Sequence, residues 1–315
     1  MLQCRCAARA GARLVRQSHS ASAELRRQLD SGSSHLDLRF ADFGEATSAA
    51  ALGDALAGGA IKGVDLRHNE VGDEGAARLV RALRRGRALE WVDLRANGLG
   101  DRGVSLVGGL LFGAEAPPLR ALNLWNNGVS PEGVRRLATC LHKNRRLESL
   151  NLGNNATEDE GAVELSDALA QHPAIADLGL RNCYVDDRGV IEGIAPLVRA
   201  SPTLRRLNLR NNCVSDLGFC SLIEAILSRD GPRLELLDLQ GNEVTSAGVA
   251  LVREHTADKA HLLPEQILLH KQLGVKGSPV SLVYRAGEGW SEPQRAGAPE
   301  AGPLAESDPY GWEAR

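Results

Sequence analysis

A pattern that recurs seven times along the chain constrains its fold more than any other feature of the sequence. The copies begin at Ile61, Leu89, Leu119, Leu147, Ile175, Leu204 and Leu234, and they share the frame LxxLxLxxN. The asparagine position of this frame holds Asn69, Asn97, Asn127, Asn155, Cys183, Asn212 and Asn242, at intervals of 28 to 30 residues. Such regular spacing is typical of a solenoid, in which each repeat packs on its neighbours.

Each position of the frame has a physical role. The leucines alternate with period two, which predicts a short strand with one buried face, and strands of successive repeats can pair in parallel. An asparagine side chain carries donors and an acceptor, so it can satisfy backbone groups where the chain turns inward. A buried group left unpaired would cost about 1–3 kcal/mol. We therefore expect the asparagine positions to form a structural ladder, in which Cys183 donates only weakly.

A helix is predicted after each strand. Ser130, Asp186, Ser215 and Thr245 stand where an N-cap is expected, and Pro131 occupies a first helical position. A glycine recurs six residues after every asparagine position. Glycine costs a helix about 1 kcal/mol relative to alanine, so its recurrence implies close backbone packing.

Strand–helix units stacked in one direction predict an α/β solenoid, a curved horseshoe with parallel strands inside and helices outside. A doubly wound α/β sheet also alternates strands and helices. Its units would not share an asparagine in fixed register, so we reject that architecture.

The frame resembles the ribonuclease-inhibitor-like class of leucine-rich repeats, which also occurs in the sensor domains of NOD-like receptors. The resemblance covers roughly residues 35–254. It implies a leucine-rich-repeat solenoid that binds proteins on its concave face. It does not imply one particular partner, because a fold alone does not fix function.

The part before the repeats is basic. Residues 1–23 contain several arginines and no acidic residue, which fits either an organellar transit peptide or a disordered tail, and both alternatives stay open. We place this tail at residues 1–30 and the repeat domain at 31–254. A degenerate first copy begins at His35 and has Ala41 at the asparagine position, as expected for a terminal repeat.

The part after the repeats is expected to cover the open end of the core. We place this cap at residues 255–286, with a short helix over 264–273 and a strand over 278–284. Residues 287–315 are rich in Pro, Gly, Ala and Glu, which predicts disorder.

Composition argues against several functional classes. The net charge of −3 lacks the basic excess of most nucleic-acid binders, and no apolar stretch is long enough to span a membrane. The six cysteines are scattered, which favours free thiols in a reducing compartment. We expect an intracellular protein, cytoplasmic or organellar, with no nucleic-acid or membrane partner.

Motifs of catalysis and cofactor binding are also missing from the sequence. It contains no HExxH metal site, no GxxxxGK[ST] phosphate loop and no GxSxG nucleophile elbow. Asp65, Asp93 and Asp238 recur with the repeat, so they are better explained as strand-surface residues than as catalytic acids. We therefore expect no enzyme, no cofactor and no metal.

The concave surface carries the candidate binding residues. Because the strand leucines face the core, the residues between and after them should point to the concave side. This reasoning selects Arg67, Trp91, Asp93, Arg95, Trp125, Arg181 and Arg210. Trp and Arg are enriched at interface hot spots, and we expect the glycines at 153 and 179 to leave a gap beside Trp125 for a partner's side chain. The alternative is that neighbours such as Asp93 and Arg95 only pair with each other across the sheet.

Two functions fit these expectations best. The first is a non-enzymatic protein-binding scaffold or adaptor. The second is a regulator that activates a small GTPase, because the Ran activators use repeats that resemble these. Those proteins generally carry more repeats and an acidic tail, and neither feature is found in this sequence.

Overall fold

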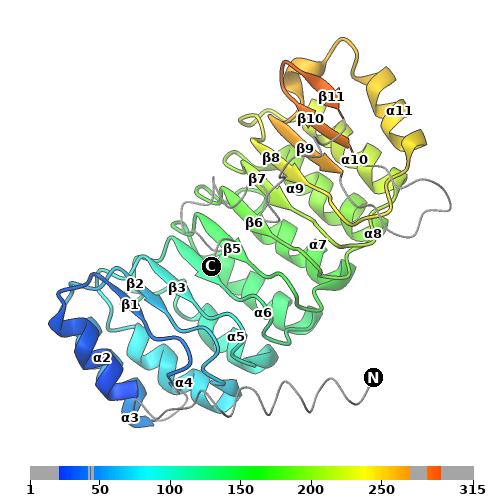
Figure 1. Ribbon diagram of the computed structural model, residues 1–315. Helices are drawn as coiled ribbons and strands as arrows, with labels where there is room; N and C mark the ends of the chain where they lie inside the picture. The colour runs from blue at the N-terminus through cyan, green and yellow to red at the C-terminus, as the bar shows by residue number, and fades with distance from the viewer. Residues whose placement is uncertain (1–20, 42, 44–45, 270–281, 292–315) are drawn as a thin grey trace, which may run out of the picture.

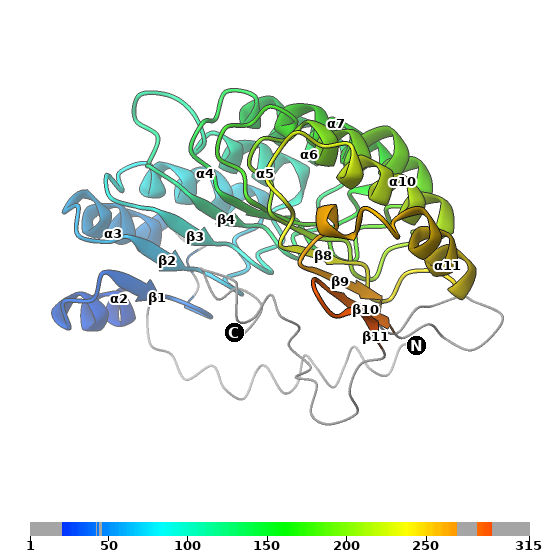
Figure 2. The same ribbon diagram turned by 90° about the horizontal axis from the view of Figure 1, so that it is seen from above.

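Parallel strands line the inner side of a curved solenoid, and helices cover its outer side (Figures 1 and 2). The computed structural model describes residues 21–41, 43, 46–269 and 282–291. The predicted α/β horseshoe is confirmed, because each copy of the frame forms one strand and the segment that follows it forms helix.

The described residues form a single sheet whose strands lie in chain order. They are β1 (His35–Asp37), β2 (Gly63–Asp65), β3 (Trp91–Asp93), β4 (Ala121–Asn123), β5 (Ser149–Asn151), β6 (Asp177–Gly179), β7 (Arg206–Asn208), β8 (Leu236–Asp238), β9 (Gln266–Leu269), β10 (Leu282–Arg285) and β11 (Gly289–Ser291). Pairing is parallel from β1 to β9 and antiparallel for β10 and β11. Equivalent positions of the frame are in register, so Leu122 lies beside Leu150, and Leu150 lies beside Leu178.

The helices on the outer side follow the strands. They are α3 (Ala46–Ala57), α4 (Gly72–Leu83), α5 (Gly100–Gly108), α6 (Pro131–Leu141), α7 (Glu158–Leu169), α8 (Asp187–Gly189), the π-helix η1 (Val190–Ile194), α9 (Ala195–Ala200), α10 (Asp216–Leu227) and α11 (Ser246–His255). Each helix buries one face against the sheet and packs beside the next helix.

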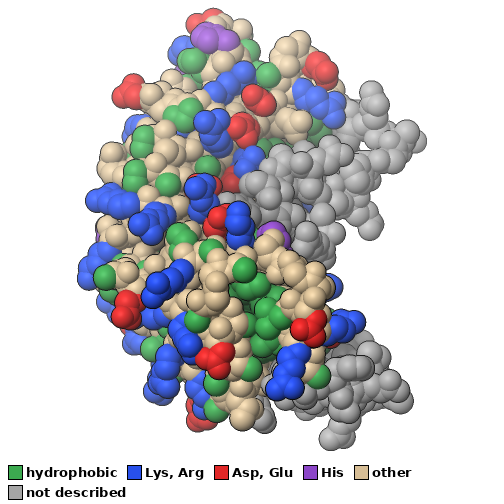
Figure 3. Space-filling view, turned by 90° about the vertical axis from the view of Figure 1, so that its left-hand side faces the viewer, with side chains coloured by type: hydrophobic (Ala, Val, Ile, Leu, Met, Phe, Trp, Pro, Cys, Tyr) green, Lys and Arg blue, Asp and Glu red, His purple; other side chains and the backbone are tan. Residues whose placement is uncertain are grey.

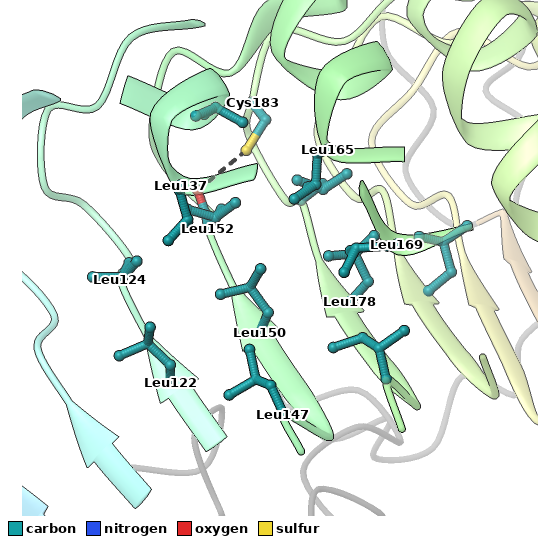
Figure 4. Close-up of a cluster of buried hydrophobic side chains, with 14 of the residues drawn as sticks. Leu122, Leu124, Leu137, Leu147, Leu150, Leu152, Leu165, Leu169, Leu178 and Cys183 are labelled. Carbon is teal, nitrogen blue, oxygen red and sulfur yellow. Dashed lines mark hydrogen bonds between the residues drawn. The ribbon is translucent and has the colours of Figure 1, made fainter. Parts of the chain in front are cut away.

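The core is a continuous aliphatic stack between sheet and helices (Figure 4). Leu122, Leu150 and Leu178 from neighbouring strands are at most 2 % exposed, and leucines of α6 and α7 close over them. Burying one leucine side chain contributes about 1.5–3 kcal/mol, so the repeated leucine positions hold the repeats together.

Part of the segment predicted as an N-terminal tail is helical. Residues placed in the predicted tail form helix α2 (Ala21–Asp30), which covers the first strand. Leu25 is 2 % exposed within the core, and the Gln28 side chain accepts a hydrogen bond from the backbone of Asp37 at 2.6 Å. The open edge of β1 needs such a cover. The predicted transit peptide otherwise falls on residues 1–20, which lie outside the described residues.

The C-terminal cap is built from strands. Part of the predicted helix over 264–273 is strand β9, which pairs in parallel with β8 because Ile267 extends the leucine column of the core. β10 overlaps the end of the strand predicted over 278–284. β11 lies in the part predicted to be disordered, and it is held there by Trp290, which packs against Tyr284 with ring centroids 5.4 Å apart. The remainder of that predicted helix and residues 292–315 lie outside the described residues.

Candidate functional site

The asparagines of the frame are buried and bonded to the backbone of two repeats. Asn127 is 1 % exposed, and its Nδ2 donates to the carbonyls of Leu94 and Leu124, both at 2.9 Å. Its Oδ1 accepts from the backbone of Asn97 at 3.1 Å. Asn69, Asn97, Asn155, Asn212 and Asn242 make the same kind of contacts. These asparagines therefore fix the inward turn after each strand.

Cys183 continues this ladder with weaker bonds. Its Sγ lies 3.4 Å from the carbonyl oxygen of Leu152 (Figure 4). Its backbone donates to Asn212 Oδ1 at 2.9 Å. Burial raises the pKa of the Cys183 thiol to about 11, so the thiol stays protonated and unreactive at neutral pH.

A second ladder, made of aspartates at the helix starts, was not recognised in the sequence. Asp187 Oδ1 accepts from the backbone of Ser215 at 2.8 Å and of Gly218 at 2.9 Å in the next repeat. Asp73, Asp101, Asp159 and Asp216 make the equivalent contact. Their recurrence four residues after the asparagine position was the available signal.

The aspartate ladder explains the recurring glycines at positions 103, 133, 189, 218 and 248, and it corrects one predicted cap. A Cβ at position 218 would lie 2.5 Å from Asp187 Oδ1, so only glycine lets the carboxylate approach. Asp186, Ser215 and Thr245 cap their helices through their side chains, as predicted. Ser130 makes no such cap, although its hydroxyl donates to Asp101 Oδ2 at 2.6 Å, as the hydroxyls of Ser215 and Thr245 donate to their aspartates.

The two strand tryptophans lie on the concave side of the sheet, each over a glycine of a neighbouring repeat. A Cβ added to Gly63 would fall 1.9 Å from the Trp91 ring, and one added to Gly153 would fall 2.2 Å from the Trp125 ring. Both tryptophans remain partly exposed. The predicted gap beside Trp125 is therefore occupied by its own indole, because a flat ring gains contact by covering the glycine backbone.

Arg67 and Asp93 are not accessible, contrary to their assignment as contact residues. They are 6 % and 2 % exposed. Arg67 pairs with Asp65 at 2.6 Å, and Arg95 pairs with Asp93 at 2.8 Å. Burial raises the pKa of Asp93, while the Arg95 guanidinium opposes that shift. Asp93 therefore positions Arg95 within the same repeat, whereas the alternative expected such pairs across adjacent strands, as between Arg67 and Asp93 at 3.6 Å.

Trp125, Arg181 and Arg210 follow one another along the concave wall, with the repeat of Gly153 between Trp125 and Arg181. The Arg181 guanidinium carbon is 5.4 Å from the Trp125 ring centroid, within the range of a cation–π contact. Arg181 and Arg210 are neighbours, because the backbone of Asn182 donates to the Arg210 carbonyl at 2.8 Å. All three side chains are partly exposed.

A row of asparagines borders this wall. Asn126, Asn154 and Asn182 precede the ladder position and have φ near +55°, which asparagine tolerates better than most residues. Asn154 Nδ2 donates to Asn126 Oδ1 at 2.7 Å, and Asn182 Nδ2 donates to Asn154 Oδ1 at 2.5 Å. The row therefore presents polar groups at the edge of the concave face.

Other kinds of site receive no support from the described part of the chain. Its His, Cys, Asp and Glu side chains include no cluster of three that could hold a metal ion. None of its helices combines the length and the apolar character that crossing a membrane requires. On the flank seen in Figure 3, basic and acidic side chains are interspersed and give no field of a single sign.

Comparisons with known proteins agree with this architecture. A family model described as Leucine Rich repeat matches residues 62–80, 115–138, 143–166 and 200–219. Together with the sheet and the asparagine ladder, this match makes the chain an α/β leucine-rich-repeat solenoid. No curated protein sequence matches the chain.

Three solved structures are similar to the chain at low sequence identity. Actin-binding site 2 of leiomodin-1 is 18 % identical, covers 45 % of this chain and 80 % of its own, and has a TM-score of 0.37. The tropomodulin C-terminal domain from Caenorhabditis elegans is 18 % identical, with 42 % and 81 % covered and a TM-score of 0.36. The yeast Rad7 and Elc1 complex matches at 12 % identity over 65 % and 70 %, with a TM-score of 0.32.

Proposed function

We propose that the chain is a non-enzymatic scaffold that binds a protein partner on its concave face. Trp125 carries this proposal. Its indole is partly exposed in the turn directly after β4, in a chain whose core is mostly aliphatic, and it faces Arg181. A tryptophan that the core does not need, set beside arginine on a rigid sheet, is typical of an interface hot spot. Trp91, Arg95 and Arg210 extend the proposed surface along the same wall.

The repeats are, in this proposal, of the ribonuclease-inhibitor-like class. Their length of 28 to 30 residues and the helix that closes each of them support the assignment. The repeat domain then runs from about residue 21 to 255, and β9, β10 and β11 form its cap.

The proposal is tested by capturing partners from the native source with the full chain as bait. Trp125→Ala should lose the partners that the unchanged chain captures, because truncation removes most of a hot spot's contact area. Leu251→Ala is the matched control, since Leu251 is 59 % exposed on the outer helix α11. Mass spectrometry compares the captured proteins, and thermal melting shows whether both variants are folded. Equal capture by Trp125→Ala and the unchanged chain would refute binding through this wall.

A further inference from the structure

Two columns of residues on the concave face differ between the two halves of the solenoid. The arginine column, directly after the last strand leucine, reads Arg39, Arg67, Arg95, Trp125, Gly153, Arg181, Arg210 and Gln240. The acid column, two residues earlier, reads Asp37, Asp65, Asp93, Asn123, Asn151, Gly179, Asn208 and Asp238. The first three arginines thus have an aspartate in their own repeat, whereas Arg181 and Arg210 do not.

Arginines of the N-terminal half are neutralised inside the sheet. Arg67 pairs with Asp65 at 2.6 Å, and its Nε lies 3.6 Å from Asp93 in the next repeat. Arg95 pairs with Asp93 at 2.8 Å. Each guanidinium there already has a carboxylate within its own wall, so this half has little charge left for a ligand.

Asparagine keeps the structural role of the aspartate without its charge. Asp93 Oδ1 accepts from the backbone of Arg95 at 3.1 Å, and Asn208 Oδ1 accepts from the backbone of Arg210 at 3.0 Å. The turn after the strand is therefore fixed equally well in both halves. Only the carboxylate is missing beside Arg210.

Arg210 has no ion pair with the residues that the structure describes. Its Nε is buried and has no hydrogen-bond partner in the described part of the chain to which it could donate. Of the acids on the neighbouring strands, Asp177 and Glu235 both pair with Arg206. Asp238, which lies in register beside Asn208, accepts from the backbone of Gln240 at 2.9 Å. A guanidinium with a desolvated, unsatisfied N–H gains more from an added carboxylate than a solvated one does.

We infer that Arg210, together with the neighbouring Arg181 and the Trp125 indole that Arg181 contacts, recognises an acidic segment of the partner polypeptide, through a carboxylate of Asp or Glu. This inference rests on the proposed function and names the chemistry of the partner. The indole offers an apolar surface next to the guanidinium groups, which suits a peptide better than a polyphosphate. Nucleic acid is disfavoured because its affinity grows with the number of phosphates neutralised, and Arg206, a further guanidinium on this stretch of the wall, already pairs with Asp177 and Glu235.

The test measures binding of a short fluorescein-labelled peptide of alternating Glu and Gly to the full chain by fluorescence anisotropy at low ionic strength. We expect binding of this peptide but not of the analogue with Gln in place of Glu. Arg210→Gln should weaken binding about tenfold. Asn208→Asp should weaken it to a similar degree, because it restores the missing aspartate and leaves the backbone hydrogen bond intact.

Arg39→Gln is the matched control, since Arg39 belongs to the same column and is paired with Asp37. Its affinity should stay within about twofold of the unchanged chain. Equal affinity of Asn208→Asp and the unchanged chain, no binding of the Glu peptide, or tighter binding of a single-stranded oligonucleotide would each overturn the inference. If partner capture is lost with Trp125→Ala but kept with Arg210→Gln and Asn208→Asp, the proposed function stands and the acidic partner does not.

Discussion

At the scale of single residues, His172 accepts a backbone hydrogen bond through a ring nitrogen. Asn144 and Ser201 accept the equivalent bond through a side-chain oxygen in the neighbouring repeats. Its Nδ1 accepts from the backbone of Ile175 at 3.1 Å, as Asn144 Oδ1 accepts from Leu147 at 2.8 Å. Because Nδ1 is an acceptor, the proton is assigned to Nε2, which faces Asn144 Oδ1 at 3.2 Å. Burial, assisted by Arg145, lowers the pKa of His172 to about 4.

This lowered pKa predicts a loss of stability in mild acid. The folded state holds a neutral ring, so its contribution is complete above the unfolded pKa of about 6.5. As the pH falls from about 6.5 towards 4, only the unfolded chain takes up the proton, and the free energy of unfolding should fall by about 2–3 kcal/mol. Urea unfolding at neutral pH and again near the lower end of this pH range, at about pH 4, measures the loss in the free energy of unfolding.

The control is His172→Asn, which can accept the same backbone hydrogen bonds without titrating. Protonation of carboxylates changes the free energy of unfolding of both proteins equally. The difference between their plots of this free energy against pH therefore isolates the contribution of His172. Parallel profiles for the two proteins would contradict the assignment of a neutral, buried ring.

At the scale of elements, neighbouring helices are held at a distance that only glycine permits. A Cβ at position 133 in α6 would lie 2.3 Å from Asp101 Oδ1 and 3.0 Å from Asp101 Cα. Position 161 in α7 faces Pro131, where the aspartate ladder is interrupted, and the nearest atom to its Cβ would be Thr157 Cγ2 at 3.0 Å. The two glycines therefore form a matched pair with different steric demands.

Gly133→Ala should lower the free energy of unfolding by about 1–3 kcal/mol, because backbone as well as side chain must move. Gly161→Ala should change it by less than about 1 kcal/mol, since the helix propensity of alanine offsets the tighter contact. Chemical denaturation of both variants provides the comparison. An equal loss for the two variants would show that propensity, rather than the aspartate contact, selects the glycines.

Variation in repeat length is absorbed in the helices and loops and leaves the strands unchanged. From Cys183 to Asn212 the interval is 29 residues, one more than in the preceding two repeats, and this repeat contains the π-helix η1. Pro196 follows in α9 and cannot donate a backbone hydrogen bond. A π-turn accommodates one extra residue without changing the strand register. The spacing predicted the extra residue, but not where it would be placed.

At the scale of the whole molecule, stability should be local, because each repeat contacts only its neighbours. Trp290 on β11 contacts Tyr284 and lies 5.7 Å from the Arg253 guanidinium carbon, so it joins the cap to α11. Trp290→Ala should speed amide exchange about tenfold in β9 and β8, while β4 and β5 keep their protection. Mass-detected hydrogen exchange resolves these segments. Uniform acceleration along the sheet would indicate a single cooperative unit instead.

The sequence by itself determined the solenoid, its strands and its ladder of asparagines. Period-two leucines and an asparagine at fixed intervals are local signals that repeat, and repetition makes each of them unambiguous. In this way Asn127 could be assigned to the buried ladder, and Trp125 could be assigned to the concave face. The aspartate ladder was also present in the spacing, although its meaning depends on a contact with the next repeat.

Only the tertiary structure decided which concave residues are available. Asp93 and Arg95 have similar positions in the sequence pattern, yet Asp93 is buried and Arg95 is partly exposed. The reason is that the long arginine side chain can fold over its shorter neighbour. The cap was likewise decided by the open edge of β8, which makes a strand of residues whose local pattern favoured a helix. Local periodicity fixes the repeat, whereas accessibility and the two ends depend on contacts between residues distant in the chain.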